Sequence, residues 1–203
     1  MKKEINALWQ KLISYLSKEQ CFLIFLYQAF IVYLENMRAG IQWRKGNVRE
    51  SGGIEDLMQL GKMFQGISGE ELKQSVKDFE ESILWKVIAK EHVCEACVRE
   101  LKDLLNGCIQ SCEDLERVIT LLEKLASELD GLQFTPESVN RMFAAIPVNE
   151  GTASIAELYC GLAGTGLAVY DNLSAHGCNV NMTCEEQRRL YCDISRIRMF
   201  CHG

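Results

Sequence analysis

A glycine-rich loop between two short apolar segments constrains the fold of this chain more than any other feature. The loop covers Cys160–Gly166 (CGLAGTG) and follows a predicted strand over 154–159. A helix is predicted from the loop to His176, then a second strand over 178–183 and a final helix over 185–200. Glycines let the backbone turn sharply from a strand into a helix. This order of elements predicts a partial, Rossmann-like α/β segment, the opening of a doubly wound domain.

The residues before this segment have helical periodicity. Apolar residues recur at three- and four-residue intervals in a predicted helix over 4–37. A loop is predicted over 38–53, and a short helix over 54–64 follows it. Ser68 with Glu71 three residues later forms a capping box that predicts the start of the next helices. These helices are most simply a bundle whose apolar stripes form a core.

The change from one pattern to the other gives the domain organisation. Thr135, Pro136 and Glu137 predict a helix start, with threonine as the cap, proline at the first helical position and an acid in the first turn. We therefore predict a mainly helical N-terminal domain over 1–130 and the partial α/β segment over 131–203.

The charge of the chain bears on its partners. The net charge of −6 is unfavourable for a protein that grips DNA alone, because neutralising phosphates supplies most of that affinity. Basic residues are instead local. They lie in two clusters, Arg38, Arg44, Lys45 and Arg49, and Arg188, Arg189, Arg196 and Arg198. We expect weak DNA binding by this chain alone, and a solvated helix face for the second cluster.

The cysteines and the N-terminus indicate the compartment. The chain has ten cysteines, but its start (MKKE) leads into an amphipathic helix and not into a signal peptide. A reduced, cytoplasmic protein with cysteines packed as small hydrophobes is therefore expected. The apolar run Cys21–Leu34 has 14 residues, fewer than the roughly 20 that cross a bilayer. It predicts a core helix and no membrane association.

Four cysteines have a spacing that allows two interpretations. They are Cys94, Cys97, Cys108 and Cys112, placed around a predicted turn at Asn106-Gly107. Four thiolates could bind zinc across a helical hairpin. The spacing between the two pairs is not that of a zinc ribbon, and the same positions fall near one apolar stripe. Packing is the favoured interpretation, and no metal site is predicted.

The glycine loop also indicates a ligand. In a doubly wound domain the ligand binds at the carboxyl end of the first strand, and an acid at the end of the second strand holds the ribose hydroxyls. Gly161, Gly164 and Gly166 supply the loop, and Glu185 or Glu186 supplies the acid. The pattern therefore favours an adenosine-containing ligand, while a loop needed only for packing fits it equally well.

Three segments in this part of the chain resemble the N-6 adenine DNA methylase family of restriction–modification systems. They are FTPESV, ELYCGLAGTGLAVY and NVNMTCEEQRRLYCDISRIRMFCHG, and they agree with the family in order and spacing over about 131–203. The family has an aromatic-Thr-Pro segment, an acidic-x-x-Cys-Gly-x-Gly-Gly loop and an acidic end to the second strand. The helical region before them also resembles the N-terminal domain of type I methylase subunits, without a motif that secures it.

The resemblance implies S-adenosylmethionine as the cofactor and site-specific adenine-N6 DNA methylation as the activity. It implies that the pocket is bordered by residues from all three segments, namely Phe134, Thr135, Pro136, Glu157, Cys160, Gly161, Gly164 and Glu185. The sequence departs from the family pattern at three places. Glu157 replaces the usual aspartate, Leu158-Tyr159 replaces a proline and a small residue, and Ala163 stands where glycine is frequent.

The catalytic motif of that family does not occur in the chain. A flipped adenine is held by a short [ND]-P-P-[YF] segment in the family, and this sequence has only Pro136 and Pro147. No catalytic residue is therefore predicted, and the chain resembles a methyltransferase truncated before that motif. Its expected partners are DNA in a complete enzyme and a C-terminal half or partner protein, which would cover apolar surface and strand edges left by a two-stranded sheet. The alternative is a non-catalytic helical interaction or regulatory module with a vestigial methyltransferase fold.

Overall fold

The computed structural model consists of two compact units, Met1–Leu132 and Gln133–Gly203. The residues that the structure describes are 2–45, 69–83, 92–127, 134–146 and 151–202. The chain is mostly helical and contains a two-stranded parallel sheet, which confirms the prediction of a helical region followed by a small α/β segment. The predicted helix over 54–64 and the cap at Ser68 lie outside the described residues.

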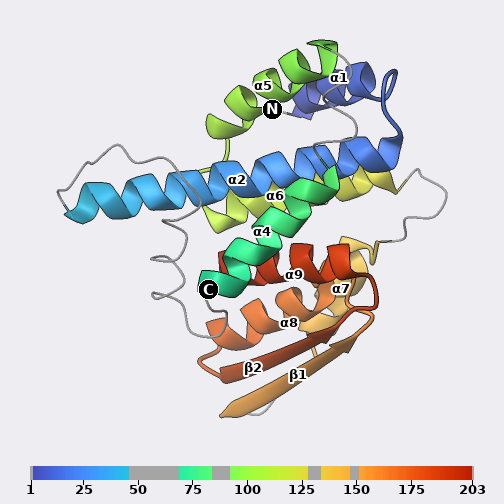
Figure 1. Cartoon of the computed structure of the whole chain (residues 1–203). Helices are drawn as coiled ribbons and strands as arrows, with labels where there is room; N and C mark the ends of the chain where they lie inside the picture. The colour runs from blue at the N-terminus through green and yellow to red at the C-terminus, as the bar shows by residue number, and fades with distance from the viewer. Residues whose placement is uncertain (1, 46–68, 84–91, 128–133, 147–150, 203) are drawn as a thin grey trace. The chain divides into compact units, whose positions relative to one another are not determined.

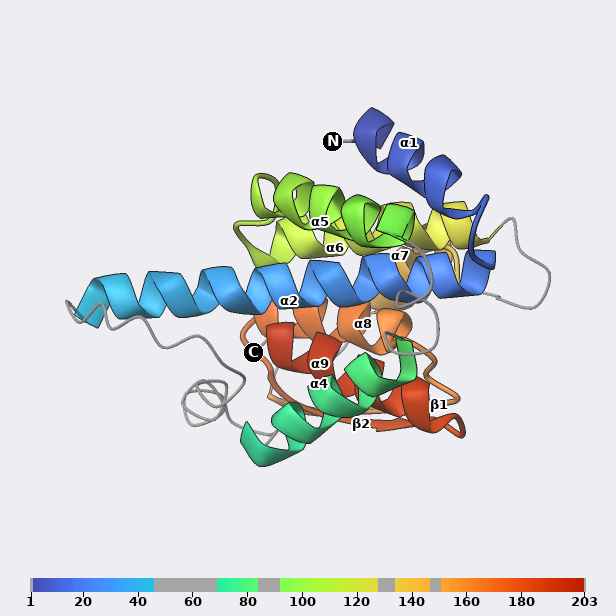
Figure 2. The same cartoon turned by 45° about the horizontal axis from the view of Figure 1, so that its top comes forward.

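The first unit is built around one long helix. Its elements are α1 (Lys2–Leu12), α2 (Lys18–Lys45), α4 (Gly69–Ile83), α5 (His92–Asn106) and α6 (Cys112–Ala126). Helix α2 packs against α4, α5 and α6, and α1 packs against α5. In Figure 2, α4 lies below α2, and the α5–α6 pair lies above it.

The prediction of one continuous helix over 4–37 was wrong over 13–17, where the chain turns between α1 and α2. The chain breaks between α1 and α2, where the side chain of Gln20 accepts a hydrogen bond from the Ser17 backbone N–H at 3.0 Å. The Ser17 hydroxyl in turn accepts one from the Gln20 N–H at 3.2 Å. This reciprocal capping box starts a new helix. The predicted loop over 38–53 was also wrong in its first part, because α2 continues to Lys45.

Helix α2 supplies much of the core of this unit. Phe22, Phe25 and Phe30 are buried, and the ring of Phe25 meets Trp9 of α1 edge-on at 5.5 Å between centroids. The stretch Lys18–Met37 is 20 residues long and apolar enough to cross a bilayer by length and composition, longer than the run noted in the sequence. Because 72% of it is buried inside the unit, it has the burial of a core helix in a soluble protein.

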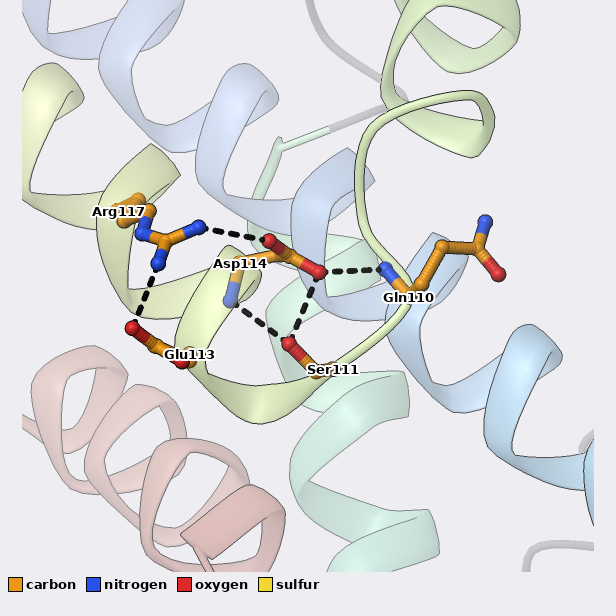
Figure 3. A network of polar contacts seen from close by, with 5 residues as sticks. All are labelled: Gln110, Ser111, Glu113, Asp114 and Arg117. Carbon is orange, nitrogen blue, oxygen red and sulfur yellow. Dashed lines mark hydrogen bonds and ion pairs between the residues drawn. The ribbon is translucent and has the colours of Figure 1, made fainter.

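The start of α6 is held by a local polar network (Figure 3). The Ser111 hydroxyl accepts a hydrogen bond from the Asp114 N–H at 3.1 Å and donates to the Asp114 carboxylate at 2.8 Å. That carboxylate also accepts from the Gln110 N–H, and these contacts hold the pKa of Asp114 below its usual value. Arg117 bridges Asp114 and Glu113 on the exposed side. The network ends the α5–α6 turn and fixes where α6 begins.

The second unit is a strand–helix–strand motif with two further helices. Its elements are α7 (Glu137–Ala144), β1 (Thr152–Leu158), α8 (Gly164–Ala175), β2 (Asn179–Glu185) and α9 (Arg189–His202). The strands are parallel and in register from Thr152 opposite Asn179 to Leu158 opposite Glu185. All three helices lie on the same side of the sheet in both views (Figures 1 and 2).

The face of the sheet away from these helices is largely polar. Along both strands, exposed residues alternate with half-buried ones, as expected for a sheet covered on one side. The exposed positions are Thr152, Ser154, Ala156, Leu158, Asn179, Asn181, Thr183 and Glu185. The expected exposed apolar surface is present in this unit, but much of it lies on and just after α7, at Met142, Phe143 and Ile146, while small and polar side chains occupy this face of the sheet. Only Leu158, 63% exposed, and the neighbouring Tyr159, 82% exposed, are large and apolar there.

Several element boundaries in this unit differ from the prediction. Strand β1 covers Thr152–Leu158 where 154–159 was predicted, and β2 covers Asn179–Glu185 where 178–183 was predicted. Helix α7 is capped at Pro136 and not at Thr135, because the Pro136 carbonyl accepts the first helical bond from the Asn140 N–H at 3.1 Å. Glu185 ends β2 and does not begin the last helix. Its carbonyl accepts from the Cys160 N–H at 2.9 Å, which extends the ladder by one bond beyond β1.

Candidate functional site

The loop between β1 and α8 contains three residues with left-handed backbone. They are Tyr159, Gly161 and Ala163, with φ values of 57°, 55° and 58°. This conformation costs a non-glycine residue about 1–2 kcal/mol. Because position 163 requires left-handed backbone, a glycine would suit it. Ala163 occupies it instead, with its methyl group fully buried. Strain at the exposed Tyr159 is of the kind that concentrates at functional sites.

Gly161 gives the loop an open surface. A Cβ added at this residue would meet no atom of the described residues within 4 Å, so they leave the space beside its α-carbon open. Its N–H donates to the carboxylate of Glu186 at 2.9 Å, and that carboxylate also accepts from the Arg188 N–H at 2.8 Å. Glu186 is thus already used to hold the loop. Of the two acids at this end of the sheet, it is not the one left for a ligand.

Glu185 is the acid that remains accessible. It lies exposed at the carboxyl end of β2, directly opposite Leu158 in the register. Its carboxylate has no hydrogen bond or ion pair with any residue that the structure describes. An accessible acid at the end of the second parallel strand is where a ribose would be held in a doubly wound domain.

Helix α9 supports the loop from beneath. The Ser195 hydroxyl donates to the Gly161 carbonyl at 3.1 Å, and Arg198 donates to the Leu162 carbonyl at 3.0 Å. Arg198 is only 5% exposed, so its assignment to a solvated helix face was wrong. A buried guanidinium needs partners of this kind, and the loop carbonyls supply one. These two contacts fix the shape of the loop without using its outer surface.

Glu157 faces the helix and not the open side of the loop. Its carboxylate accepts from the Gly166 N–H at 3.0 Å. The N-cap residue of α8, Ala163, has no side-chain acceptor, so Glu157 supplies one for the first turn. Burial raises the pKa of Glu157, while the bonds from Gly166 and Thr165 and the charge of Arg198 oppose that rise. The structure therefore gives Glu157 a capping role.

Gly164 and Gly166 differ in what surrounds them. A Cβ at Gly166 would lie 2.3 Å from the Met182 methyl carbon and 2.6 Å from the Glu157 carboxylate. A Cβ at Gly164 would reach Arg198 and an amide nitrogen only at 3.5 Å, an ordinary contact distance. Gly166 is thus required for the close approach of α8 to the sheet, the packing role of one glycine in such loops.

The aromatic-Thr-Pro segment lies just before α7. Phe134 is half-buried, and Thr135 and Pro136 are exposed. Helix α7 itself is tied to the loop end of α8, because the Thr165 hydroxyl donates to the Asn140 side chain at 2.8 Å. The segment is thereby held near the glycine loop through α7.

The cysteines of the first unit carry no ligand cluster among the described residues. Cys97 is buried, and Cys108 and Cys112 are half-buried, all with free thiols. The side chain of Cys94 lies outside the described residues. Within the described part of the chain, no three histidine, cysteine or acidic side chains converge on a metal position.

No protein-family model matches the chain, and a search of curated proteins gives no match. The site therefore stands on its own geometry. Sequence reasoning missed the roles of Ser195 and Arg198, since helical periodicity gives no sign that a polar residue points at a loop carbonyl.

Proposed function

We propose that residues 134–203 form the opening part of an S-adenosylmethionine-binding, Rossmann-like domain of the adenine-N6 DNA methyltransferase class. The observation that carries the proposal is the open surface at Gly161 beside Glu185, whose carboxylate has no partner among the described residues, at the carboxyl ends of adjacent parallel strands. This is the position at which such domains take an adenosine-containing ligand.

The geometry favours a ligand over a loop used for packing alone. A packing loop would turn its glycines inward, as Gly166 does. Gly161 instead has left-handed backbone and faces free space, while Ser195, Glu186 and Arg198 hold the loop from its other sides. In the proposed complex Glu185 accepts hydrogen bonds from the ribose hydroxyls, and the backbone around Gly161 lies against the methionine end.

The proposal for this chain is cofactor binding and not methyl transfer. The sequence has no Pro-Pro pair, so the segment that holds a flipped adenine in the family has no counterpart in these 203 residues. DNA recognition and catalysis belong, in this proposal, to a complete enzyme to which a further segment or partner contributes that motif.

Calorimetric titration with S-adenosylmethionine tests the proposal, with two matched variants. Gly161→Arg and Gly177→Arg each place a long side chain on a left-handed glycine that faces open space. The two substitutions therefore carry similar backbone strain, but Gly177 follows α8 at the other end of the strands. Binding by the parent chain and by Gly177→Arg, together with loss in Gly161→Arg, supports the proposal.

The opposite result has a definite meaning. A folded parent chain that shows no heat of binding with S-adenosylmethionine refutes a working cofactor site. Equal binding by both variants refutes its location at the loop. Either result favours the alternative of an interaction module with a vestigial methyltransferase fold.

A further inference from the structure

The open edge of β1 presents backbone groups for pairing with another strand. Among the described residues, β1 pairs only with β2. The Gly151 carbonyl accepts a hydrogen bond from the Asn179 N–H at 2.9 Å, and successive residues of a strand direct these groups to opposite edges. The N–H and carbonyl groups of Ser154 and Ala156 therefore face away from β2. A row of such groups is a template for pairing.

Strand β1 lacks the features that normally protect an edge. Natural edge strands carry lysine, proline or a bulge, or are very short. Strand β1 (TASIAEL) has seven residues in continuous register with β2, without proline or a basic residue. Its only charged residue, Glu157, accepts a hydrogen bond from the Gly166 N–H of α8. The charge is thus used inside the unit and does not guard the edge.

The edge of β2 is less suited to pairing. This strand contains Asn179 and Asn181, a residue type that is depleted in strands, and it ends at the exposed Glu185. Strand β1 ends instead at the exposed Leu158, which is followed by the exposed Tyr159. Apolar side chains left in water at the end of a strand favour β1 as the edge that a partner covers.

A second group of exposed apolar side chains lies toward the other end of β1. Its members are Met142, Phe143 and Ile146. The neighbouring Ala144 carbonyl accepts from the Asn172 side chain, in the last turn of α8. Because α8 runs back from the carboxyl ends of the strands to their amino ends, this α7 group lies toward the amino end of β1. The two sets of apolar side chains therefore lie toward opposite ends of one strand.

We propose that the open edge of β1 pairs with the same edge of a second copy of this chain, antiparallel about a twofold axis at Ile155. Antiparallel pairing brings the carboxyl end of one strand beside the amino end of the other. Leu158 and Tyr159 of each copy are thereby carried toward the α7 group of the other copy. One self-complementary surface then covers both sets, as an interface with twofold symmetry requires.

The register follows from the direction of the backbone groups. Residues that exchange hydrogen bonds in an antiparallel pair lie directly opposite one another. With Ile155 opposite its counterpart, Ser154 lies opposite Ala156 of the second copy, and both direct their backbone groups to the shared edge. Ile155 is only half-buried on the helix-covered side, so each isoleucine gains cover from the other. This inference does not rest on the proposed cofactor site, because it concerns only the strand edge.

Sedimentation equilibrium of the full chain tests the proposal. We expect a reversible dimer with twice the 23.0 kDa mass of one chain. Hydrogen exchange in peptides from β1 should be slower in the dimer than in the monomer, with β2 peptides as the internal reference. A strand from a further segment of a complete enzyme would use the same edge. A chain that stays monomeric throughout the micromolar range favours that occupant and overturns the proposal.

Two matched lysines locate the interface. Ser154 and Asn181 are exposed on the same face and lie opposite one another in the β1–β2 register. Ser154→Lys should raise the dissociation constant of the dimer roughly tenfold, because the lysines of the two copies meet across the shared edge. Asn181→Lys places the same charge one strand away and should leave the constant unchanged. Equal effects of the two lysines would overturn the location at β1.

A charge pair tests the register. Ser154→Lys combined with Ala156→Glu places each lysine opposite a glutamate of the other copy, and should restore most of the affinity lost in Ser154→Lys. A double variant that dimerises no better than Ser154→Lys overturns the proposed pairing. If the variants fail to fold, the parent chain still decides the matter. A dimer whose β1 peptides exchange as fast as those of the monomer overturns the proposal as well.

Discussion

The contact between α8 and the sheet predicts that replacing glycine by alanine has opposite effects on stability at positions 166 and 164. In Gly166→Ala the added methyl group would lie 2.3 Å from the Met182 methyl carbon and 2.6 Å from the Glu157 carboxylate. The methionine end can swing away at about 0.5–1.5 kcal/mol. The carboxylate must leave the Gly166 N–H, and a hydrogen bond to a charged group contributes about 1.5–3 kcal/mol. Alanine returns about 1 kcal/mol in helix propensity. The net loss of stability is therefore about 2 kcal/mol.

Gly164→Ala is the matched control. Its methyl group would meet atoms of the described residues only at 3.5 Å or beyond, so none of these neighbours has to move. We expect a change between zero and a gain of about 1 kcal/mol, because alanine is the better helix former.

Hydrogen exchange followed by mass spectrometry is the suitable assay for this pair. The three tryptophans of the chain, Trp9, Trp43 and Trp85, all lie in the first unit, so their fluorescence does not report on the second. A loss of about 2 kcal/mol corresponds to roughly 30-fold faster exchange in peptides from β1, α8 and β2. Equal exchange in the two variants would refute the argument, since it would mean that α8 moves away from the sheet at no cost.

Three further outcomes are expected. Tyr159→Asn should stabilise the second unit by about 0.5–1 kcal/mol, since asparagine tolerates left-handed backbone, whereas Tyr159→Phe should leave exchange unchanged. Burial raises the pKa of Glu157, so the parent chain should lose stability as the pH rises from 4.5 through that raised pKa, and Glu157→Gln should lack this loss. Thermal unfolding followed by circular dichroism between pH 4 and 7 tests this, and equal changes in both chains would contradict it. Ser17→Ala should lower the free energy of unfolding by about 1 kcal/mol, measured by urea unfolding with tryptophan fluorescence. Ser14→Ala should cost nothing measurable, because the Ser14 hydroxyl bonds the Lys11 carbonyl and caps no helix. Similar losses in both variants would contradict the capping argument.

The sequence was sufficient to predict the order of elements in the second unit. A glycine loop between two short segments, followed by a helix, leaves few alternatives to a strand–helix–strand motif. The polar outer face was not predicted, although Thr152 and Ser154 alternate with Ala153 and Ile155 along β1. Period-two alternation of this kind indicates a sheet with one covered side.

Other features depended on contacts that periodicity does not encode. The break between α1 and α2 falls within an unbroken apolar spacing, and only the pairing of Ser17 with Gln20 marks it. The buried Arg198 side chain donates a hydrogen bond to the Leu162 carbonyl, 36 positions earlier in the chain. The distinction between Glu185 and Glu186 likewise depends on which carboxylate meets the Gly161 N–H. In each case the deciding partner is a particular polar atom, which a pattern of apolar residues cannot specify.

The support of the glycine loop by α9 has a consequence for the entropy and the kinetics with which a molecule would bind there. Fixing the backbone of one residue removes conformational entropy equivalent to about 1–2 kcal/mol. Because Ser195 and Arg198 already hold the Gly161 and Leu162 carbonyls, that entropy is lost when the unit folds and not when a molecule arrives. A molecule that fits this surface would meet a rigid template. Its association should follow a single kinetic phase limited by encounter, without a slower phase in which the loop rearranges.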